Sequence, residues 1–359
     1  MPASEKPFHP HILTAGLPAQ TRFAHAHPPM APAANYTASQ EVVEGEEVVR
    51  LGDAARGAEV SIARTIGNNA YAMKVQGRSI LRTPPNLGQL RQQPVFFGIP
   101  FMGPWANRLE QDAYQVNGRR YLLDPRLGNF LRDGNGLPIH GLLTCSPDWE
   151  LVSLEADDVS ARSVCRLEFG RHPALMAQFP FAHTLVMTHR LQQGVLEVET
   201  QLENQAAEWL PVSLGYHPYF QLPESPRDSW SVRLAGGDEI LLSEKYLPTG
   251  ETRPLQLPDS VLLAGLPSSH VLCNLQRGAD GGAEFWVEGG EGRITMIQGP
   301  NYPVDVVYAP PNQRYVCFEP MAATINALNP LPHGRRPELP GVPPGGRWRE
   351  SFWIQYAPS

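Results

Sequence analysis

The chain has 359 residues and a mass of 39.6 kDa, a length that one large β-sandwich can fill as a single domain. Only 18% of the residues are charged, which excludes a coiled coil, and the net charge of −7 disfavours a broad positive surface for nucleic acid. The 32 glycines and 37 prolines favour many turns over long helices.

The N-terminal segment, residues 1–40, is rich in proline, alanine and histidine. Such a segment cannot bury much apolar surface, so we expect an arm that is disordered or lies across the domain surface. A solvated tail is a simpler interpretation than a metal site for its four histidines, which are His9, His11, His25 and His27. Residues 41–359 are expected to form a single domain.

From residue 41 onward the pattern changes to short extended segments separated by turns. A short helix is predicted near residues 86–93, before the break at Pro94. The clearest strand is at residues 196–203, where apolar residues and Thr200 alternate with glutamate and glutamine, and a turn at 192–194 separates it from an extended segment at 181–191. Further strands are predicted at 209–214, 231–234, 293–298, 304–308 and 315–318. The predicted fold class is all-β, a large antiparallel β-sandwich with few short helices.

No feature of the sequence marks a targeted or cross-linked protein. No segment has the apolar length of a transmembrane helix, and the N-terminus lacks the pattern of a secretory signal. The four cysteines are scattered, with no Cys-x-x-Cys pair, which disfavours structural zinc and a disulfide framework. We therefore expect a cytoplasmic protein with neither a membrane nor a nucleic-acid partner.

His217 and Glu319 are the strongest candidates for chemistry. Each is directly followed by proline, which pushes the preceding residue into an extended backbone and would hold both titratable groups on stiffened chain. The aromatic neighbours of His217 suit the apolar face of a sugar ring, and they include Tyr216 as a candidate substrate contact. The apolar neighbours of Glu319 would raise the pKa of its carboxyl and make it a better base near neutral pH.

Each candidate also has a structural interpretation. A histidine beside aromatic rings is more often a hydrogen-bonded structural residue. A glutamate before proline at a strand end is usually solvated, and Asn107-Arg108 can be a turn with a surface ion pair. The residues alone leave these interpretations open.

Five short motifs nevertheless follow one another in a recognisable order. They are Asn107-Arg108-Leu109, Ile139-His140-Gly141, Tyr216-His217-Pro218-Tyr219-Phe220, Pro248-Thr249-Gly250 and Phe318-Glu319-Pro320. In this order they resemble the aldose 1-epimerases, or galactose mutarotases, and the broader mutarotase-like superfamily, from about Val48 to the C-terminus.

The resemblance implies a β-sandwich with its site in a cleft on the concave sheet, where the α and β anomers of a free hexose are interconverted. It implies that Glu319 is the general base, that His217 is the general acid and that His140 assists near the ring oxygen. Asn107 and Arg108 would bind sugar hydroxyls. No metal or other cofactor is needed, and the partner is a small-molecule sugar bound by a monomer or homodimer.

Two departures from the family pattern concern the substrate. Members that act on galactose and glucose usually carry a sugar-binding aspartate after Pro-Thr-Gly, and here Gln256 or Asp259 stands near that position. Val306 occupies the place of a family glutamine. A related branch acts on hexose 6-phosphates, for which four arginines are available to hold the phosphate: Arg119, Arg120, Arg126 and Arg132.

Other functions stay open at this point. One is hexose-6-phosphate 1-epimerase, and another is a non-catalytic sugar-binding or sugar-sensing protein on the same fold. A third is an oxygenase whose iron is held by His140, His217 and Glu319. The fourth is a glycosidase that pairs Glu319 with Asp305.

Overall fold

The computed structural model describes residues 35–359. Most of the predicted arm lies outside these residues, but the boundary predicted at residue 41 falls inside a strand. This strand, β1 (Tyr36–Val43), buries Tyr36 and leaves most of its other side chains partly or fully exposed, so its sequence does not stand out from a polar tail. It pairs antiparallel with β2 (Glu46–Asp53) along its whole length.

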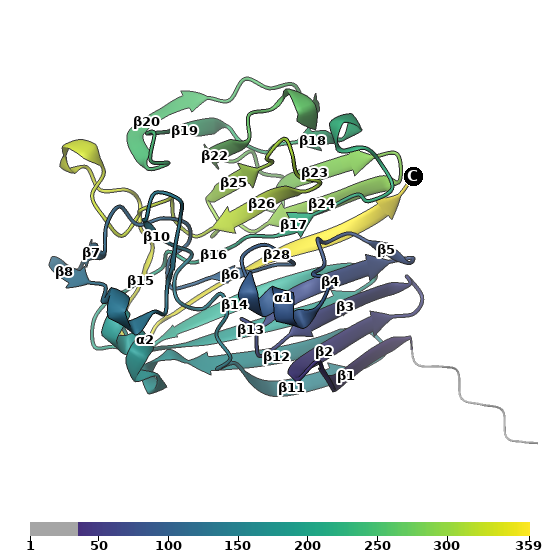
Figure 1. Cartoon of the computed structure of the whole chain (residues 1–359), viewed down its shortest axis with the longest axis horizontal. Helices are drawn as coiled ribbons and strands as arrows, with labels where there is room; N and C mark the ends of the chain where they lie inside the picture. The colour runs from purple at the N-terminus through teal and green to yellow at the C-terminus, as the bar shows by residue number, and fades with distance from the viewer. Residues whose placement is uncertain (1–34) are drawn as a thin grey trace, which may run out of the picture. The chain divides into compact units, whose positions relative to one another are not determined.

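The first layer of the fold is a nine-stranded antiparallel sheet (Figure 1). Its strands in spatial order are β11 (Glu150–Ala156), β12 (Ala161–Glu168), β13 (His183–Gln192), β14 (Val195–Asn204), β28 (Arg347–Pro358), β24 (Gly292–Gln298), β23 (Ala283–Gly289), β18 (Ser231–Arg233) and β21 (Val261–Leu262). The strand β28 therefore lies near the middle, between β14 and β24.

The second layer is made of two antiparallel sheets. The five-stranded sheet runs in chain order through β1, β2, β3 (Ala58–Ala63), β4 (Asn69–Val75) and β5 (Arg78–Ser79). The eight-stranded sheet runs through β20 (Pro248–Pro254), β19 (Asp238–Leu242), β22 (Ser269–Cys273), β25 (Val304–Tyr308), β26 (Val316–Met321), β16 (Gly215–Tyr216) and β6 (Phe101–Met102), with β17 (Tyr219–Phe220) also paired to β26. A bridge between Leu81 and Phe220 joins the two sheets.

The remaining elements are short. Three two-stranded pairs are β7 (Ala113–Val116) with β8 (Arg119–Leu122), β9 (Leu131–Arg132) with β10 (Pro138–Ile139), and β15 (Leu210–Pro211) with β27 (Gly341–Val342). The helical turns are α1 (Leu87–Gln92), α2 (Pro173–Gln178), η1 (Pro125–Leu127), η2 (Phe169–Arg171), η3 (Arg227–Ser229), η4 (Leu263–Gly265) and η5 (Pro332–Gly334). No helix within residues 35–359 has the length and apolar character needed to cross a bilayer. The predicted all-β antiparallel sandwich with few short helices is confirmed.

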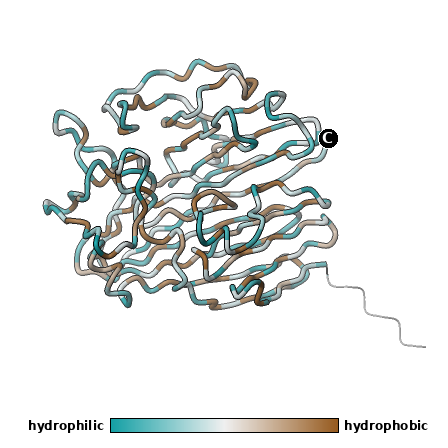
Figure 2. The backbone as a smooth tube through the Cα atoms, in the orientation of Figure 1, coloured by the Kyte–Doolittle hydropathy of each residue, from teal (hydrophilic) through white to brown (hydrophobic). Residues whose placement is uncertain are grey.

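One large hydrophobic core lies between the two layers, and apolar residues recur along the strands of both (Figure 2). Tyr216 from the eight-stranded sheet packs on Phe352 of β28, with ring centroids 4.9 Å apart. Phe318 of β26 similarly packs on Phe285 of β23 at 5.6 Å. Because side chains alternate along a strand, the neighbour of Phe318, Glu319, faces away from this core.

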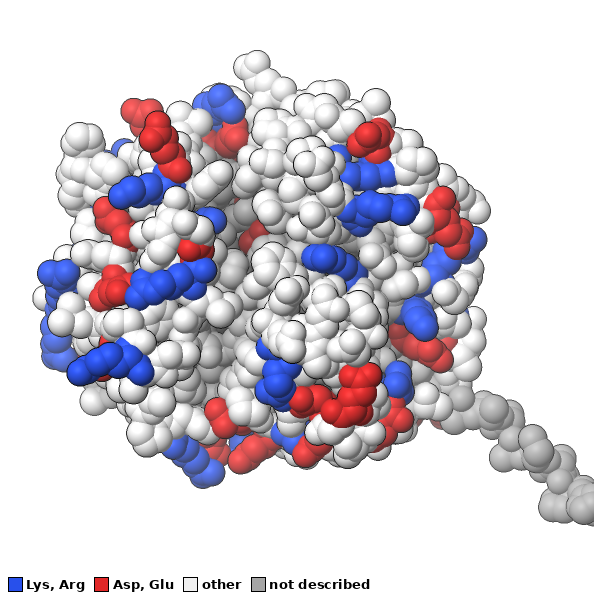
Figure 3. Space-filling model, in the orientation of Figure 1, with Lys and Arg blue, Asp and Glu red and all other residues white. Residues whose placement is uncertain are grey.

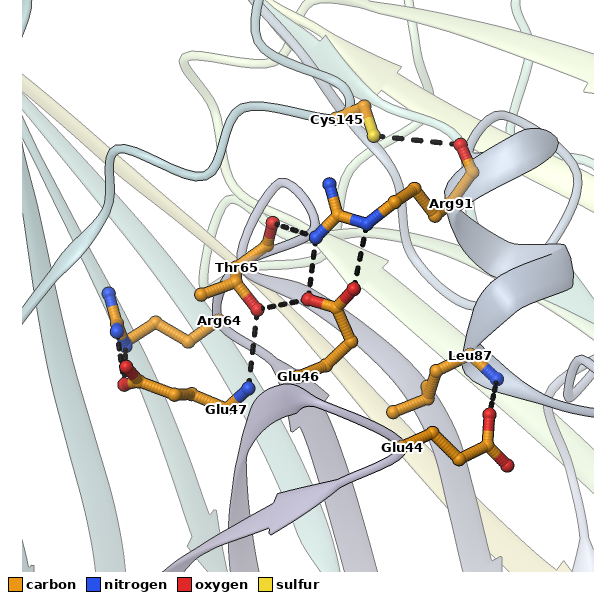
Figure 4. A network of polar contacts seen from close by, with 8 residues as sticks. All are labelled: Glu44, Glu46, Glu47, Arg64, Thr65, Leu87, Arg91 and Cys145. Atoms are coloured by element: carbon orange, nitrogen blue, oxygen red, sulfur yellow. Dashed lines mark hydrogen bonds and ion pairs between the residues drawn. The ribbon is translucent and has the colours of Figure 1, made fainter.

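The helix α1 was predicted from its flanking residues, and a polar network fixes its position. Asn86 caps the helix by accepting a hydrogen bond from the backbone of Gln89 at 2.8 Å. Arg91 at the other end donates to Glu46 at the start of β2, with an Nε–Oε1 distance of 2.7 Å, and Glu46 also accepts from Thr65 at 2.6 Å (Figure 4). The network places the last residue of α1 and the segment that follows it, residues 92–96 together, at the rim of the cavity described next.

Candidate active site

A cavity of about 560 Å³ opens on the face of the eight-stranded sheet that is turned away from the core. Figure 3 shows a face of the molecule that is hollowed near its centre, with positive and negative side chains mixed around the hollow. Segments far apart in the sequence meet at the cavity, and the charged, histidine and aromatic side chains among its lining are Phe96, Arg108, Arg132, Asp133, His140, His217, Tyr219, Tyr246, Tyr308 and Glu319.

His217 and Glu319 meet in this cavity. Nε2 of His217 lies 3.2 Å from Oε1 of Glu319, and the two residues are 6% and 1% exposed. Oε2 of Glu319 has no hydrogen-bond partner among the described residues. A buried carboxylate oxygen with this free capacity, beside an imidazole, is available to a hydroxyl group of a ligand.

The aromatic neighbours of His217 fix the orientation of its imidazole. The ring of Tyr219 stacks on it with centroids 4.5 Å apart and an interplanar angle of 4°, and the hydroxyl of Tyr219 lies 3.4 Å from Nε2. Tyr308 approaches the same imidazole edge-on at 6.1 Å. The backbone N–H of His217 donates to the carbonyl of Pro100 at 3.0 Å. The imidazole is therefore held on several sides before any ligand arrives.

His140 completes a cluster of three titratable groups. Its backbone is left-handed, with φ of 62°, and its ring meets His217 edge-on at a centroid distance of 5.5 Å. The backbone N–H of His140 donates to the backbone carbonyl of Asn107 at 2.9 Å, and this bond joins two of the predicted motifs directly. Nδ1 of His140 is buried and has no hydrogen-bond partner within residues 35–359.

Arg108 is held at the wall of the cavity by its neighbours. Its Nε donates to Oδ2 of Asp133 at 2.6 Å, and its Nη1 donates to Oδ1 of Asn107 at 3.0 Å. The ring of Tyr246 covers the guanidinium at 5.0 Å. These contacts give Arg108 a fixed direction, and they balance its charge with that of Asp133.

Burial drives the titratable groups of the cluster toward their neutral forms. It raises the pKa of Glu319 well above its usual 4.5, an effect that the nearby Asp305 strengthens and Arg108 opposes. Burial also lowers the pKa values of His217 and His140 below 6.5, and the charge of Arg108 contributes in both cases. The carboxylate of Glu319 is therefore a stronger base than in water, and the protonated imidazoles of His217 and His140 are stronger acids.

Three predicted substrate-binding residues lie elsewhere. Tyr216 does not line the cavity, because its ring lies in the core and its hydroxyl contacts Thr200. The reason is strand alternation, which turns Tyr216 inward and its neighbour His217 outward. Gln256 and Asp259 are both exposed on the segment after β20 and do not line the cavity either. Val306 pairs with Glu319 and lines the cavity.

Three other cavity residues were not singled out from the sequence. Asp133, Tyr246 and Phe96 come from loops without a recognisable motif, so nothing in the sequence brings them to this cavity. Two further cavity residues did carry a signal: Tyr219 belongs to the motif around His217 and is one of its aromatic neighbours, and Tyr308 ends the strand predicted at 304–308.

The geometry bears on two of the alternative functions. Within the described part of the chain, no three His, Cys, Asp or Glu side chains are grouped so that they could hold a metal ion, so this arrangement does not support an iron site. Asp305 is fully buried, pairs with Pro320 and does not line the cavity. It cannot act there as the second carboxylate of a glycosidase.

Comparison with known proteins identifies the family. The family model described as aldose 1-epimerase matches residues 47–355. A galactose mutarotase-like protein from Clostridium acetobutylicum has the same fold, with a TM-score of 0.81 at 20% identity, over 90% of this chain and 99% of that one.

Two curated relatives from Escherichia coli K12 match over shorter stretches. The uncharacterized protein YihR is 26% identical over 146 residues, and YphB, also uncharacterized, is 30% identical over 133 residues. The aligned parts cover 41% and 37% of this chain and only 43% and 39% of those relatives. Because the family model spans most of the sequence, the protein belongs to the aldose 1-epimerase family.

Proposed function

We propose that the protein is an aldose 1-epimerase that interconverts the α and β anomers of a free hexose by acid–base ring opening and closing. The observation that carries this proposal is the buried pair of His217 and Glu319, with 3.2 Å between Nε2 and Oε1, at the wall of a cavity large enough for a sugar ring. Mutarotation needs one proton removed and one delivered at neighbouring oxygens, and this pair offers both groups.

In the proposed reaction Glu319 accepts the proton of the C1 hydroxyl while His217 donates a proton to the ring oxygen. The bond between C1 and the ring oxygen breaks, and an open-chain aldehyde forms. Rotation about the C1–C2 bond presents the other face of the aldehyde, and the reverse proton transfers close the ring. His140 assists near the ring oxygen, and Asn107 and Arg108 bind hydroxyl groups.

The buried pair predicts activity at unusually low pH. Catalysis needs one proton on the pair, and unshifted groups would hold one only between pH 4.5 and pH 6.5. Burial lowers the pKa of the imidazole of His217 to about 3, so the pair takes up its second proton only well below pH 4.5. We therefore expect kcat/KM, measured by NMR exchange with buffer catalysis subtracted, to show no fall around pH 4.5 as the pH is lowered from 5.5 to 4. A fall in kcat/KM with a midpoint near pH 4.5 would contradict this.

An uncharged hexose fits the cavity better than a hexose 6-phosphate. Both arginines that line it are already paired with aspartates, Arg108 with Asp133 and Arg132 with Asp112 at 2.8 Å. Three other arginines considered for a phosphate do not line the cavity. Arg119 contacts Glu208, Arg120 contacts Gln111 and Arg126 contacts Asp124. The charge of each cavity arginine is thus already balanced by a carboxylate, which weakens its attraction for a phosphate.

An exchange assay over a panel of aldoses, each with and without a 6-phosphate where one exists, tests the proposal. We expect accelerated interconversion for at least one free hexose and a lower kcat/KM for its 6-phosphate. Preference for the phosphate would support the hexose-6-phosphate alternative. Sugar binding without acceleration would support a non-catalytic binding protein. The cytoplasmic location and the monomeric or dimeric state stay predictions.

A further inference from the structure

Tyr246 has a strained backbone at the tip of the hairpin between β19 and β20. Its φ is 60°, in the left-handed region that tyrosine seldom adopts. The turn is closed on both sides, because the N–H of Tyr246 donates to the carbonyl of Ser243 at 2.9 Å and the N–H of Ser243 donates to the carbonyl of Leu247 at 2.9 Å. The turn holds the side chain in one direction at an energetic cost.

That direction brings the ring to the mouth of the candidate active site. Tyr246 lines the cavity together with Glu319 and His217, and its ring covers the guanidinium of Arg108 at 5.0 Å. The residue is nevertheless 49% exposed, so a large part of the aromatic surface has no protein neighbour. A second aromatic residue of the cavity, Phe96, is 41% exposed in the same way.

The contact with Arg108 does not by itself explain why Tyr246 has a strained backbone and an exposed ring. Asp133 and Asn107 already fix the guanidinium through hydrogen bonds of 2.6 and 3.0 Å. A residue in a rarely populated conformation persists where the surroundings or a function require it, and such residues cluster at ligand sites. An exposed aromatic ring above polar groups offers an apolar surface to the C–H face of a pyranose, while the polar groups below it bind hydroxyls.

We propose that Tyr246 is a sugar-binding residue whose ring covers the apolar face of a pyranose placed between the hairpin tip and the Glu319–His217 pair. The proposal rests on the proposed function for the identity of the ligand. It assigns to the β19–β20 hairpin the part in sugar recognition that sequence analysis gave to Gln256 and Asp259. Its ligand class is an uncharged aldopyranose with adjacent C–H groups on one face.

The test compares Tyr246→Asn and Tyr246→Phe with the unmodified chain. Asparagine tolerates the left-handed conformation and removes the ring, so KM for the best aldose should rise about three- to tenfold with kcat within about twofold. The midpoint of thermal unfolding should stay equal or rise by about 1–2 °C, because strain is relieved. Tyr246→Phe retains the ring and should raise KM less than Tyr246→Asn does.

Gln76→Asn is the matched control. Gln76 is exposed at the tip of the β4–β5 hairpin, also has a left-handed φ of 51°, and does not line the cavity. Its replacement should relieve strain in the same way and leave KM unchanged. An unchanged KM in Tyr246→Asn, or a fall in kcat at constant KM, overturns the proposal.

The outcome stays decisive if the proposed function fails. Should the unmodified protein accelerate exchange of no aldose, binding of the same sugars is measured by saturation-transfer NMR. Weaker binding by Tyr246→Asn than by the unmodified protein then supports the role of the ring. Equal binding by the two proteins, or no binding by the unmodified protein, overturns it.

Discussion

Replacing Glu319 by glutamine is expected to reduce catalysed anomer exchange by about 10²- to 10⁴-fold, because a general base contributes about that much and the other carboxylate that lines the cavity, Asp133, is paired with Arg108. The amide has the shape of the carboxyl but cannot accept the C1 proton. NMR exchange spectroscopy on the best aldose measures the loss. The matched control is Glu155→Gln, an exposed glutamate of β11 that pairs with Arg162 at 2.6 Å. Wild-type rates in Glu319→Gln would refute the proposed mechanism.

The same substitution should leave the protein at least as stable as before. The pKa of Glu319 is raised in the folded state, so between pH 4.5 and that raised value the unfolded chain gives up a proton that the folded chain keeps. The folded state of the unmodified protein therefore loses stability as the pH rises through this range. Glutamine does not titrate, so the stability of the variant relative to the unmodified protein should grow from pH 4 to pH 8. Thermal unfolding of both proteins across this range measures the difference.

Replacing His217 by asparagine is expected to lower kcat by about 10²- to 10⁴-fold, since asparagine can donate a hydrogen bond but cannot deliver a proton to the ring oxygen. KM should change less, because Arg108 and the other polar groups of the cavity remain. His172→Asn is the control: His172 is a partly exposed histidine that lies 3.6 Å from Asp148 and does not line this cavity. A variant that keeps the full kcat would exclude His217 as the acid.

Glu319 and His217 are expected to act as one unit. The double variant, Glu319→Gln with His217→Asn, should then lose little more activity than the more damaged single variant. Multiplicative losses would mean that the two residues contribute independently, which the 3.2 Å contact between them does not favour.

The regular strands and the central pair were accessible to sequence reasoning for physical reasons. The strand β14 has one buried and one half-exposed face, so apolar and polar residues alternate along its sequence and predict the strand. His217 and Glu319 could be found because each precedes a proline and belongs to a motif of the family. The two residues lie on neighbouring elements of one sheet, since β16 and β17 both pair with β26.

The other cavity residues depend on the tertiary structure. Tyr216 and Tyr219 both flank His217 in the sequence, and only the observed backbone decides that the first packs in the core and the second against the imidazole. Tyr246 and Asp133 reach the cavity from two separate loops, and the directions of loops are not encoded in a repeating pattern. The helix α2 was missed for a similar reason: its six residues are too few to show helical periodicity.

The position of β28 between β14 and β24 has a consequence for how the protein folds. Those two strands belong to distant parts of the chain, and the segment that joins them in the sheet is the last strand described. Until this strand inserts, each half of the nine-stranded sheet exposes an open edge of unpaired N–H and C=O groups, which invites association with other chains. Because such long-range closure carries a large entropic cost, we expect the insertion of β28 to slow folding.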